Sequence, residues 1–193
     1  ALETEARIYQ ESDHLIVVSD ELKTHITSCG VPAERISVVP NGVDPARFSA
    51  ANRRGAIRED LGLADACAIG FIGSLKPWHG TESLFAAFRQ FAEEFPQANL
   101  LIVGDGPCRE ELQSYADEHG IADRVVFTGK VSYNEIPDYV DAMDITVAPY
   151  IPNDNFYVSP IKIFEYMAMG KPVVAGDIGQ VKMLVKNDET GYL

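Results

Sequence analysis

The chain has 193 residues, 46% of them hydrophobic and 23% charged, which is enough to bury one large core or one core and part of another. Its net charge of -13, from 16 basic and 29 acidic residues, argues against nucleic acid or an anionic membrane surface as the main partner, but does not exclude one local basic pocket. Three cysteines in no CxxC spacing argue against a disulfide framework or a zinc site and favour a reducing compartment. The sequence contains no apolar run of about 18 residues, so no membrane span is predicted.

The first 61 residues alternate between helical and extended patterns. A short β-branched run ends at the turn-forming segment Pro40–Asp44. The elements expected in this part are a helix at 1–12, a strand at 14–18, a helix capped by Ser19 or Asp20 and ending near 28, a strand at 36–39 and a helix at 53–61.

From residue 67 onward the pattern becomes regular. Short apolar runs, which suit strands buried on both faces of a parallel sheet, alternate with amphipathic segments. The expected strands are Cys67–Ile72, Leu100–Val103, Val125–Phe127, Ile145–Ala148 and Val173–Ala175, and the expected helices are Thr81–Phe95, Cys108–His119, Asn134–Ala142 and Ile161–Met169. Repeated βα units with short loops predict an α/β fold with a Rossmann-like, doubly wound parallel sheet.

Ligands bind such sheets at the carboxyl ends of the strands, so the loops at that edge matter most. They are Gly73–Gly80, Gly104–Pro107, Thr128–Ser132, Pro149–Pro160 and Gly176–Gly179. Four of them carry a glycine within one residue of the strand, which lets a ligand approach the backbone. Thr81 and the pair Ser159-Pro160 are expected to start helices that face this edge, and helix N-termini favour phosphate. Lys76 and His79 in the first loop therefore predict a diphosphate site.

Rival motifs are poorly supported. Gly104-Asp105-Gly106 follows a strand, but Arg109 stands where the third glycine of a GxGxxG fingerprint belongs, which argues against a nicotinamide site. The sequence has no complete P-loop, HExxH motif, nucleophile elbow, EF-hand loop or aspartate-rich metal motif. We therefore expect neither a metal nor a cofactor.

Five segments stand in the order seen in retaining glycosyltransferases of family 4, which have the GT-B fold, and the chain resembles this family over nearly its whole length. The segments are Asn41–Asp44, Gly73–Gly80, Val103–Pro107, Phe127–Gly129 and Ser159–Ala175. The family has two Rossmann-like halves with the active site between them, one half binding the acceptor and the other the nucleotide sugar.

The resemblance implies a division of the chain. Residues 1–44 resemble the terminal part of the acceptor-binding half and the interdomain linker, and residues 45–193 resemble a donor domain truncated at its C-terminus. The family's histidine near the reacting sugar belongs to the missing N-terminal half, so no catalytic residue is expected in this chain. We expect the isolated fragment to bind nucleotide and to transfer little or no sugar.

Two positions are compared with the family's EX7E motif. Glu165 matches the second glutamate, which implies that it holds the ribose hydroxyls; a carboxylate can accept two such hydrogen bonds. The alternative is an ion pair with Lys162, three residues earlier on the same helix face. Tyr157 stands at the first glutamate position, where it can donate a hydrogen bond or stack on a sugar, or be an ordinary loop aromatic residue.

The phosphate and base contacts are carried over residue by residue. Many family members have arginine at the position of Ser74 and lysine at that of His79, so the diphosphate candidates here are Gly73 through its N–H, Ser74, Lys76 and His79. A second phosphate candidate is the helix start at Ser159 and Pro160, together with Lys162. The alternatives for Lys162 are the ion pair with Glu165 and a solvated charge. The nucleotide base is expected to contact Gly129, Lys130 and Val131; the alternative for Gly129 is that it only forms a tight turn. Trp78 is expected to pack within the protein and not to contact the ligand.

The resemblance implies transfer of a hexose-type sugar from a nucleotide diphosphate sugar, UDP- or GDP-linked, to an acceptor hydroxyl with retention of configuration. The acceptor would be bound by the missing N-terminal half. Two alternatives stay open, a GT-B nucleotide-sugar 2-epimerase and a catalytically silent nucleotide-binding or scaffold domain. The expected location is the cytoplasm. A peripheral position of the full-length protein at the inner face of the membrane is compatible with this location.

Overall fold

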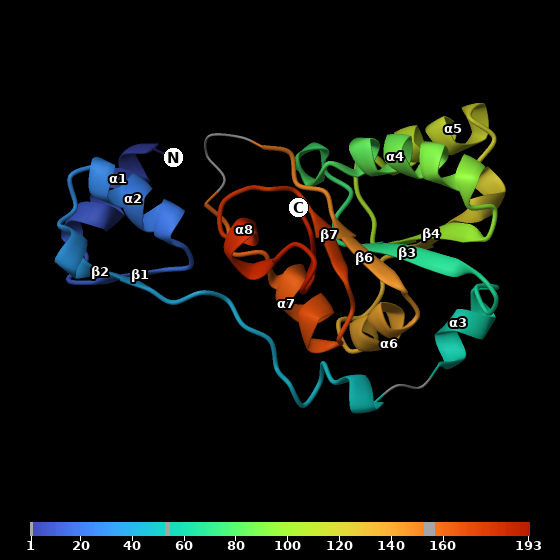
Figure 1. The fold of residues 1–193 in the computed structure, drawn as a ribbon. Helices are drawn as coiled ribbons and strands as arrows, with labels where there is room; N and C mark the ends of the chain where they lie inside the picture. Colours follow the sequence, from blue (N-terminus) through green and yellow to red (C-terminus); the bar gives the residue numbers. More distant parts are fainter. Residues whose placement is uncertain (1, 53–54, 153–156) are drawn as a thin grey trace.

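The computed structural model describes residues 2–52, 55–152 and 157–193. An N-terminal lobe and a larger α/β lobe are joined by an extended linker, residues 39–49, that runs along one side of the molecule (Figure 1). The first lobe consists of α1 (Leu2–Glu11), β1 (Leu15–Val17), α2 (Asp20–Ser28) and β2 (Ile36–Val38), and its two strands pair in parallel. Within the described ranges, no helix is long and apolar enough to cross a membrane.

The larger lobe is built on a six-stranded parallel sheet in the order β5-β4-β3-β6-β7-β8. Its strands are β3 (Cys67–Ile72), β4 (Ala98–Val103), β5 (Val125–Gly129), β6 (Ile145–Ala148), β7 (Val173–Ala175) and β8 (Gly191–Tyr192). The chain fills one side of the sheet from β3 to β5 and then returns to fill the other side from β6 to β8. The strand order therefore reverses between β3 and β6, and the carboxyl ends of these two strands form the switch point where open sheets bind ligands. The predicted doubly wound sheet is confirmed.

The main helices lie on both faces of this sheet. Figure 1 shows α4 and α5 over one face and α6 and α7 over the other. The helices of the lobe are α3 (Ala56–Asp60), α4 (Thr81–Glu94), α5 (Arg109–Glu118), α6 (Ile136–Asp141), α7 (Ile161–Ala168) and α8 (Val181–Leu184). Each expected helix is present, although Arg53, the expected start of α3, lies outside the described residues.

The expected cap at Ser19 is confirmed, since its hydroxyl accepts the N–H of Leu22 at 3.1 Å, but the expected caps of α4 and α7 are wrong. The N-cap of α4 is Gly80 with φ 68°, and Thr81 is the buried first residue of the helix. At α7 the N-cap is Pro160, with no side-chain capping bond, because Ser159 Oγ instead accepts the N–H of Asn41 at 3.1 Å. The hydroxyl of Ser159 is thus used by a segment that is distant in sequence, which a local motif does not contain.

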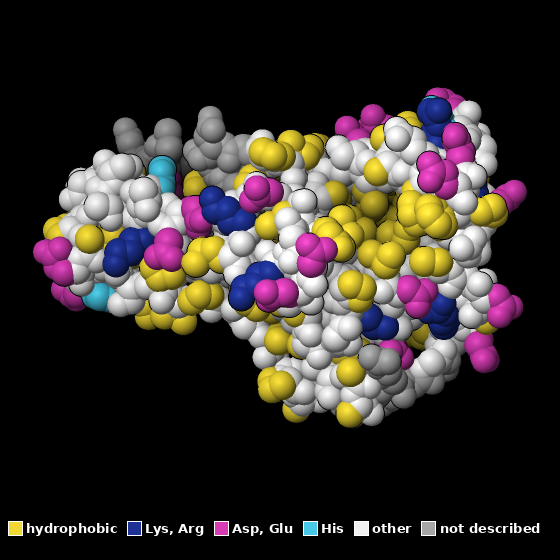
Figure 2. Space-filling model, in the orientation of Figure 1, with side chains coloured by type: hydrophobic (Ala, Val, Ile, Leu, Met, Phe, Trp, Pro, Cys, Tyr) yellow, Lys and Arg dark blue, Asp and Glu magenta, His cyan; other side chains and the backbone are white. Residues whose placement is uncertain are grey.

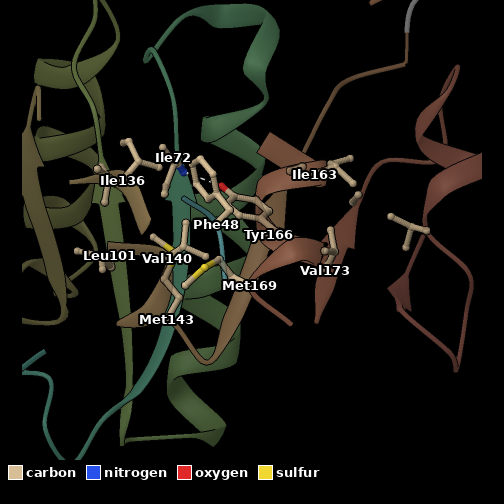
Figure 3. Close-up of a cluster of buried hydrophobic side chains, with 14 of the residues drawn as sticks. Phe48, Ile72, Leu101, Ile136, Val140, Met143, Ile163, Tyr166, Met169 and Val173 are labelled. Carbon is tan, nitrogen blue, oxygen red and sulfur yellow. Dashed lines mark hydrogen bonds between the residues drawn. The ribbon is translucent and has the colours of Figure 1, made fainter. Parts of the chain in front are cut away.

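The largest buried cluster lies between the sheet and the helices α6 and α7 (Figure 3). Pairing of β3 with β6 ends at Gly70 and Thr146, so the N–H of Ile72 has no strand partner on that side. The hydroxyl of Tyr166, a fully buried side chain of α7, accepts this N–H at 2.9 Å, as the dashed line in Figure 3 shows. Phe48, from the end of the linker, packs in the same cluster and fixes the linker to the lobe.

We expect Tyr166→Phe to lower the free energy of unfolding by about 1–3 kcal/mol, because it leaves the buried N–H of Ile72 without a partner while keeping the ring. Urea unfolding followed by circular dichroism measures the change. Tyr9→Phe is the matched control, since the Tyr9 hydroxyl donates to Glu5 on the exposed surface, where water can replace the lost bond. Equal stability of the two variants would contradict the assigned role of Tyr166.

An apolar groove of about 540 Å³ runs between α4 and the strands β6 and β7. Figure 2 shows hydrophobic side chains gathered in a hollow at this place. Apart from Ser83 and Tyr150, its lining side chains carry no polar groups, and they include Phe88, Phe91, Val147 and Val174. This groove offers no cation to a diphosphate, so the candidate site lies at the strand ends instead.

Candidate functional site

The loops at the switch point are in direct contact with one another. A Cβ on Gly104, which has φ 133°, would lie 2.0 Å from the carbonyl oxygen of Gly73, and one on Gly80 would lie 1.8 Å from that of Pro149. Both distances are far below van der Waals contact, so only glycine fits. The glycines were expected to admit a ligand to the backbone, but at these two positions they admit a neighbouring loop, and the result is one continuous rim around the ends of β3, β4 and β6.

Lys162 lies beneath this rim. It is the second residue of α7, and its Nζ is buried without a hydrogen-bond partner among the described residues. Nζ lies 4.1 Å from the centroid of the Phe71 ring and 5.3 Å from that of Tyr150, and a Cβ on Gly73 would be 2.8 Å from it. Burial lowers the pKa of Lys162 to about 7, although the charge of Glu165 favours the ammonium form. A buried amine without an acceptor is rare and points to a missing anionic partner.

His79 approaches the same point from the Gly73–Gly80 loop. Its Nδ1 contacts the carbonyl oxygen of Ser74, and because a carbonyl only accepts, Nδ1 carries the proton. Burial, followed by the charge of Lys162, lowers the pKa of His79. The neutral ring therefore leaves Nε2 as an acceptor, and it becomes a donor to phosphate only when an approaching anion restores the second proton.

The remaining candidates of this loop have other roles. The N–H of Gly73 donates to the carbonyl oxygen of Val103 at 2.9 Å, so the expected phosphate contact through this group is wrong for the structure as it stands. Gly73 instead provides the space that Lys162 Nζ occupies. Lys76 lies over the ring of Trp78, with Nζ 4.9 Å from its centroid. Trp78 was expected to pack within the protein, but 58% of its surface is exposed.

Glu165 lies one turn after Lys162 on α7 and is 5% exposed. Burial raises the pKa of its carboxyl group, against the effects of the nearby Tyr133 hydroxyl and the Lys162 charge. No ion pair between Glu165 and Lys162 is formed within 4 Å in the described residues, so Glu165 keeps acceptor capacity for a ligand.

The expected base segment follows β5. Gly129 has φ 71°, and a Cβ there would lie 3.3 Å from Nη1 of Arg109. Its carbonyl oxygen accepts the N–H of Gly104 at 2.9 Å, which ties this turn to the rim. Lys130 is exposed, and Val131 packs against the largest buried cluster, the one between the sheet and the helices α6 and α7.

Tyr157 and Ser159 connect the lobe to the N-terminal part of the chain. The carbonyl oxygen of Tyr157 accepts the hydroxyl of Ser19 at 2.8 Å, and its ring stacks on His25 with centroids 5.3 Å apart. The carbonyl oxygen of Ser159 accepts the side-chain amide of Asn41 at 2.8 Å. Pro160 is buried at the start of α7. The structure thus groups Gly73, His79, Lys162 and Glu165, and places the ring of Tyr157 against α2.

Sequence reasoning assigned no role to two residues beside Glu165. Tyr133 follows β5, and burial and the charge of nearby Glu165 raise the pKa of its hydroxyl, while Arg47 of the linker lies over the Tyr133 ring with Cζ 5.0 Å from its centroid. The resemblance carried no motif at these positions, and both residues belong to polar loops far from Glu165 in sequence. Within the described part of the chain, no group of three or more histidine, cysteine, aspartate or glutamate side chains is placed to hold a metal ion.

The chain was compared with protein families, curated proteins and solved structures. The family model described as "Glycosyl transferases group 1" matches residues 66–193, and the model described as "Glycosyltransferase Family 4" matches residues 1–47. A GDP-mannose-dependent alpha-(1-6)-phosphatidylinositol monomannoside mannosyltransferase of Mycolicibacterium smegmatis is 31% identical over 189 residues, which are 96% of this chain and 50% of that protein. A 2-deoxystreptamine glucosyltransferase of Streptomyces kanamyceticus is 32% identical over 78% of this chain and 38% of its own length.

The fold comparison agrees with the sequence comparison. The Anabaena protein Alr3699/HepE, solved in complex with UDP and glucose, has a TM-score of 0.84 and 27% identity, covering 99% of this chain and 53% of its own. The chain spans about half the length of the curated relatives it matches. Since one family model matches more than half of the chain, and since the motifs and the sheet agree with it, this chain belongs to the glycosyl transferases of group 1, with the GT-B type of Rossmann-like fold.

Proposed function

We propose that the chain binds the donor of a retaining glycosyltransferase, a nucleotide diphosphate sugar linked to UDP or GDP. The observation that carries this proposal is Lys162, whose buried Nζ has no hydrogen-bond partner among the described residues and lies beside Gly73 at the switch point of the sheet. A diphosphate at this edge would supply the missing acceptors. The first turns of α4 and α7 add N–H groups and positive dipole ends to the same edge.

The rest of the donor would be held by Glu165 and the turn after β5. The ribose hydroxyls would donate to Glu165, which is about one helical turn from Lys162, and the base would lie along Gly129, Lys130 and Val131. The UDP complex of the Anabaena protein and the GDP-mannose dependence of the mycobacterial relatives support a nucleotide donor in this family and leave both bases open. The location we propose is the cytoplasm.

During transfer, negative charge grows on the leaving diphosphate. Lys162 in its protonated form, His79 once protonated, and the helix N-termini would stabilise that charge electrostatically. We propose that residues 1–44 belong with the acceptor-binding half and the linker and that residues 45–193 form the donor domain. The acceptor would be bound by an N-terminal half, so this chain alone would transfer little or no sugar.

Isothermal titration calorimetry of the chain with UDP, GDP and ADP tests the donor site. We expect one uridine or guanosine nucleotide to bind clearly more tightly than ADP. A folded chain that binds none of the three would contradict the proposal and favour a silent scaffold domain. Sugar-transfer assays of the chain with the preferred nucleotide sugar test its expected inactivity, and product analysis with the full-length protein separates retaining transfer from 2-epimerisation.

A further inference from the structure

The amine of Lys162 lies against two aromatic rings. Its Nζ is over the ring of Phe71, 4.1 Å from the centroid, and over the ring of Tyr150, 5.3 Å from the centroid. Both distances are within the roughly 6 Å over which a cation is attracted to the negative face of a ring. Since this Nζ has no hydrogen-bond acceptor among the described residues, the rings, together with the charge of Glu165, favour its charged form.

Both rings are held in place by packing. Phe71 is fully buried on β3 and belongs to the cluster between the sheet and the helices α4 and α5. Tyr150 is also buried, but belongs to the cluster between the sheet and the helices α6 and α7. Its backbone is packed tightly, because a Cβ on Gly176 would lie 2.3 Å from its carbonyl oxygen. Lys162 of α7 therefore reaches the boundary between two buried clusters, where neither ring is free to move away.

The remaining space around Nζ is narrow. A Cβ on Gly73 would lie 2.8 Å from Nζ and 3.3 Å from the Phe71 ring, so the backbone of this glycine lies against a third side of the amine. The ring centroid of His79 is 6.1 Å from that of Phe71 and 6.1 Å from that of Tyr150. The amine is thus confined beside His79, the other candidate for contact with a diphosphate.

We propose that Phe71 and Tyr150 are positioning residues, which form an aromatic cage that keeps the Lys162 amine charged and in place for the diphosphate of a nucleotide donor. This inference rests on the proposed donor site. The rings offset part of the unfavourable burial of the charge, because an ammonium group over an aromatic face is attracted more strongly where water is excluded. They occupy none of its hydrogen bonds, so all three N–H groups stay available to phosphate oxygens.

The direct test is the pKa of Lys162 in the absence of any ligand. Trifluorinated phenylalanine in place of Phe71 nearly keeps the shape of the ring, but fluorine withdraws electrons and weakens the negative ring face. NMR of lysine labelled with carbon-13 at Cε measures the pKa, and the Lys162 signal is the one that is missing in Lys162→Met. We expect this pKa to fall by about one unit. The same residue in place of Phe85, a fully buried ring of the same cluster as Phe71, should leave it unchanged.

A second readout is the pH dependence of nucleotide binding by Phe71→Leu. Burial lowers the pKa of Lys162 to about 7, and loss of the ring should lower it further. Calorimetry with UDP or GDP, whichever binds, should therefore give nearly equal affinities for the variant and the unmodified chain at about pH 5.5, where the amine is charged in both. At about pH 8 the variant should bind about tenfold more weakly, because fewer of its molecules hold the proton. Phe85→Leu loses comparable packing and should show no pH-dependent difference.

Other charged or titratable groups face the same amine. They are Glu165 on α7, His79 with Lys76 in the loop after β3, and the phenol of Tyr150 after β6. The two leucine variants retain all of them, so the pH dependence that these groups cause is common to the variants and the unmodified chain. If Phe71→Leu does not fold, the chain with the fluorinated ring takes its place in the binding comparison.

The outcomes separate this inference from the donor site. A Lys162 pKa that is unchanged by the fluorinated ring at position 71 overturns the inference, whether or not nucleotide binds. If the pKa falls but the unmodified chain binds neither UDP nor GDP, the proposed donor site is wrong and the positioning role falls with it. A loss of affinity that is equal at the two pH values, or that Phe85→Leu shares, would show a merely structural role of Phe71 and would also overturn the inference.

Discussion

Glu165→Ala should weaken binding of the preferred nucleotide by at least about 100-fold while the chain stays folded. The carboxylate is 5% exposed and lies at the switch point beside Lys162, where it would accept the two ribose hydroxyls. Hydrogen bonds to a charged group contribute about 1.5–3 kcal/mol, and each 1.4 kcal/mol corresponds to a tenfold change in affinity. Because burial raises the pKa of this carboxyl group, its replacement also removes a group that is costly to bury in ionised form.

Calorimetry with UDP or GDP measures the loss, and thermal unfolding shows that the variant is folded. Glu118→Ala, an exposed glutamate of α5, is the control and should bind as the unmodified chain does. Glu165→Gln keeps one acceptor oxygen and should lose less affinity than the alanine variant. Unchanged affinity of Glu165→Ala in a chain that binds nucleotide would show that the ribose lies elsewhere.

The sheet could be predicted from the sequence because its strands are continuous apolar runs. Cys67–Ile72 and Ile145–Ala148 have the expected bounds, since a strand buried on both faces contrasts with the polar loops beside it. The short strand β8 has only the residues Gly191 and Tyr192, too few to show a strand pattern in the sequence. The expected cap at Ser159 failed because its hydroxyl accepts the N–H of the distant Asn41 in place of a local capping bond.

The candidate site was predictable where one motif holds its residues. Lys162 and Glu165 belong to a single helix, so their spacing already placed them at the same edge of the sheet. The contact of Arg47 with the Tyr133 ring was not predictable, because these residues come from a linker and a loop that only the folded chain brings together. The sequence also gave no sign that the N–H of Gly73 is used by the sheet, which follows from the extension of the β3–β4 ladder to Val103.

Lys162→Met should make the chain more stable and at the same time weaken nucleotide binding by at least tenfold. Burial lowers the pKa of this amine to about 7 from its ordinary 10.5, so the folded state disfavours the proton that the unfolded state keeps. Replacement of buried charged groups by apolar side chains of similar size often stabilises proteins by about 1–4 kcal/mol. A residue that lowers stability and whose loss impairs binding is kept for its ligand, since binding sites commonly sacrifice stability for function.

The pH dependence distinguishes this cause from improved packing. Between pH 7 and 10.5 the unfolded chain holds the Lys162 proton and the folded chain does not, so the stability of the unmodified chain should rise with pH in this window. The advantage of Lys162→Met should therefore be largest below pH 7 and shrink as the pH rises, which urea unfolding at several pH values measures. Lys171→Met is the opposite control: Lys171 donates to the Asp141 carbonyl oxygen at 2.8 Å and pairs with its carboxylate at 3.8 Å, so its loss should destabilise the chain without affecting nucleotide binding. A Lys162→Met chain that is less stable than the unmodified one below pH 7 would show that Lys162 already has a partner in the free protein, and the argument for an anionic ligand would fail.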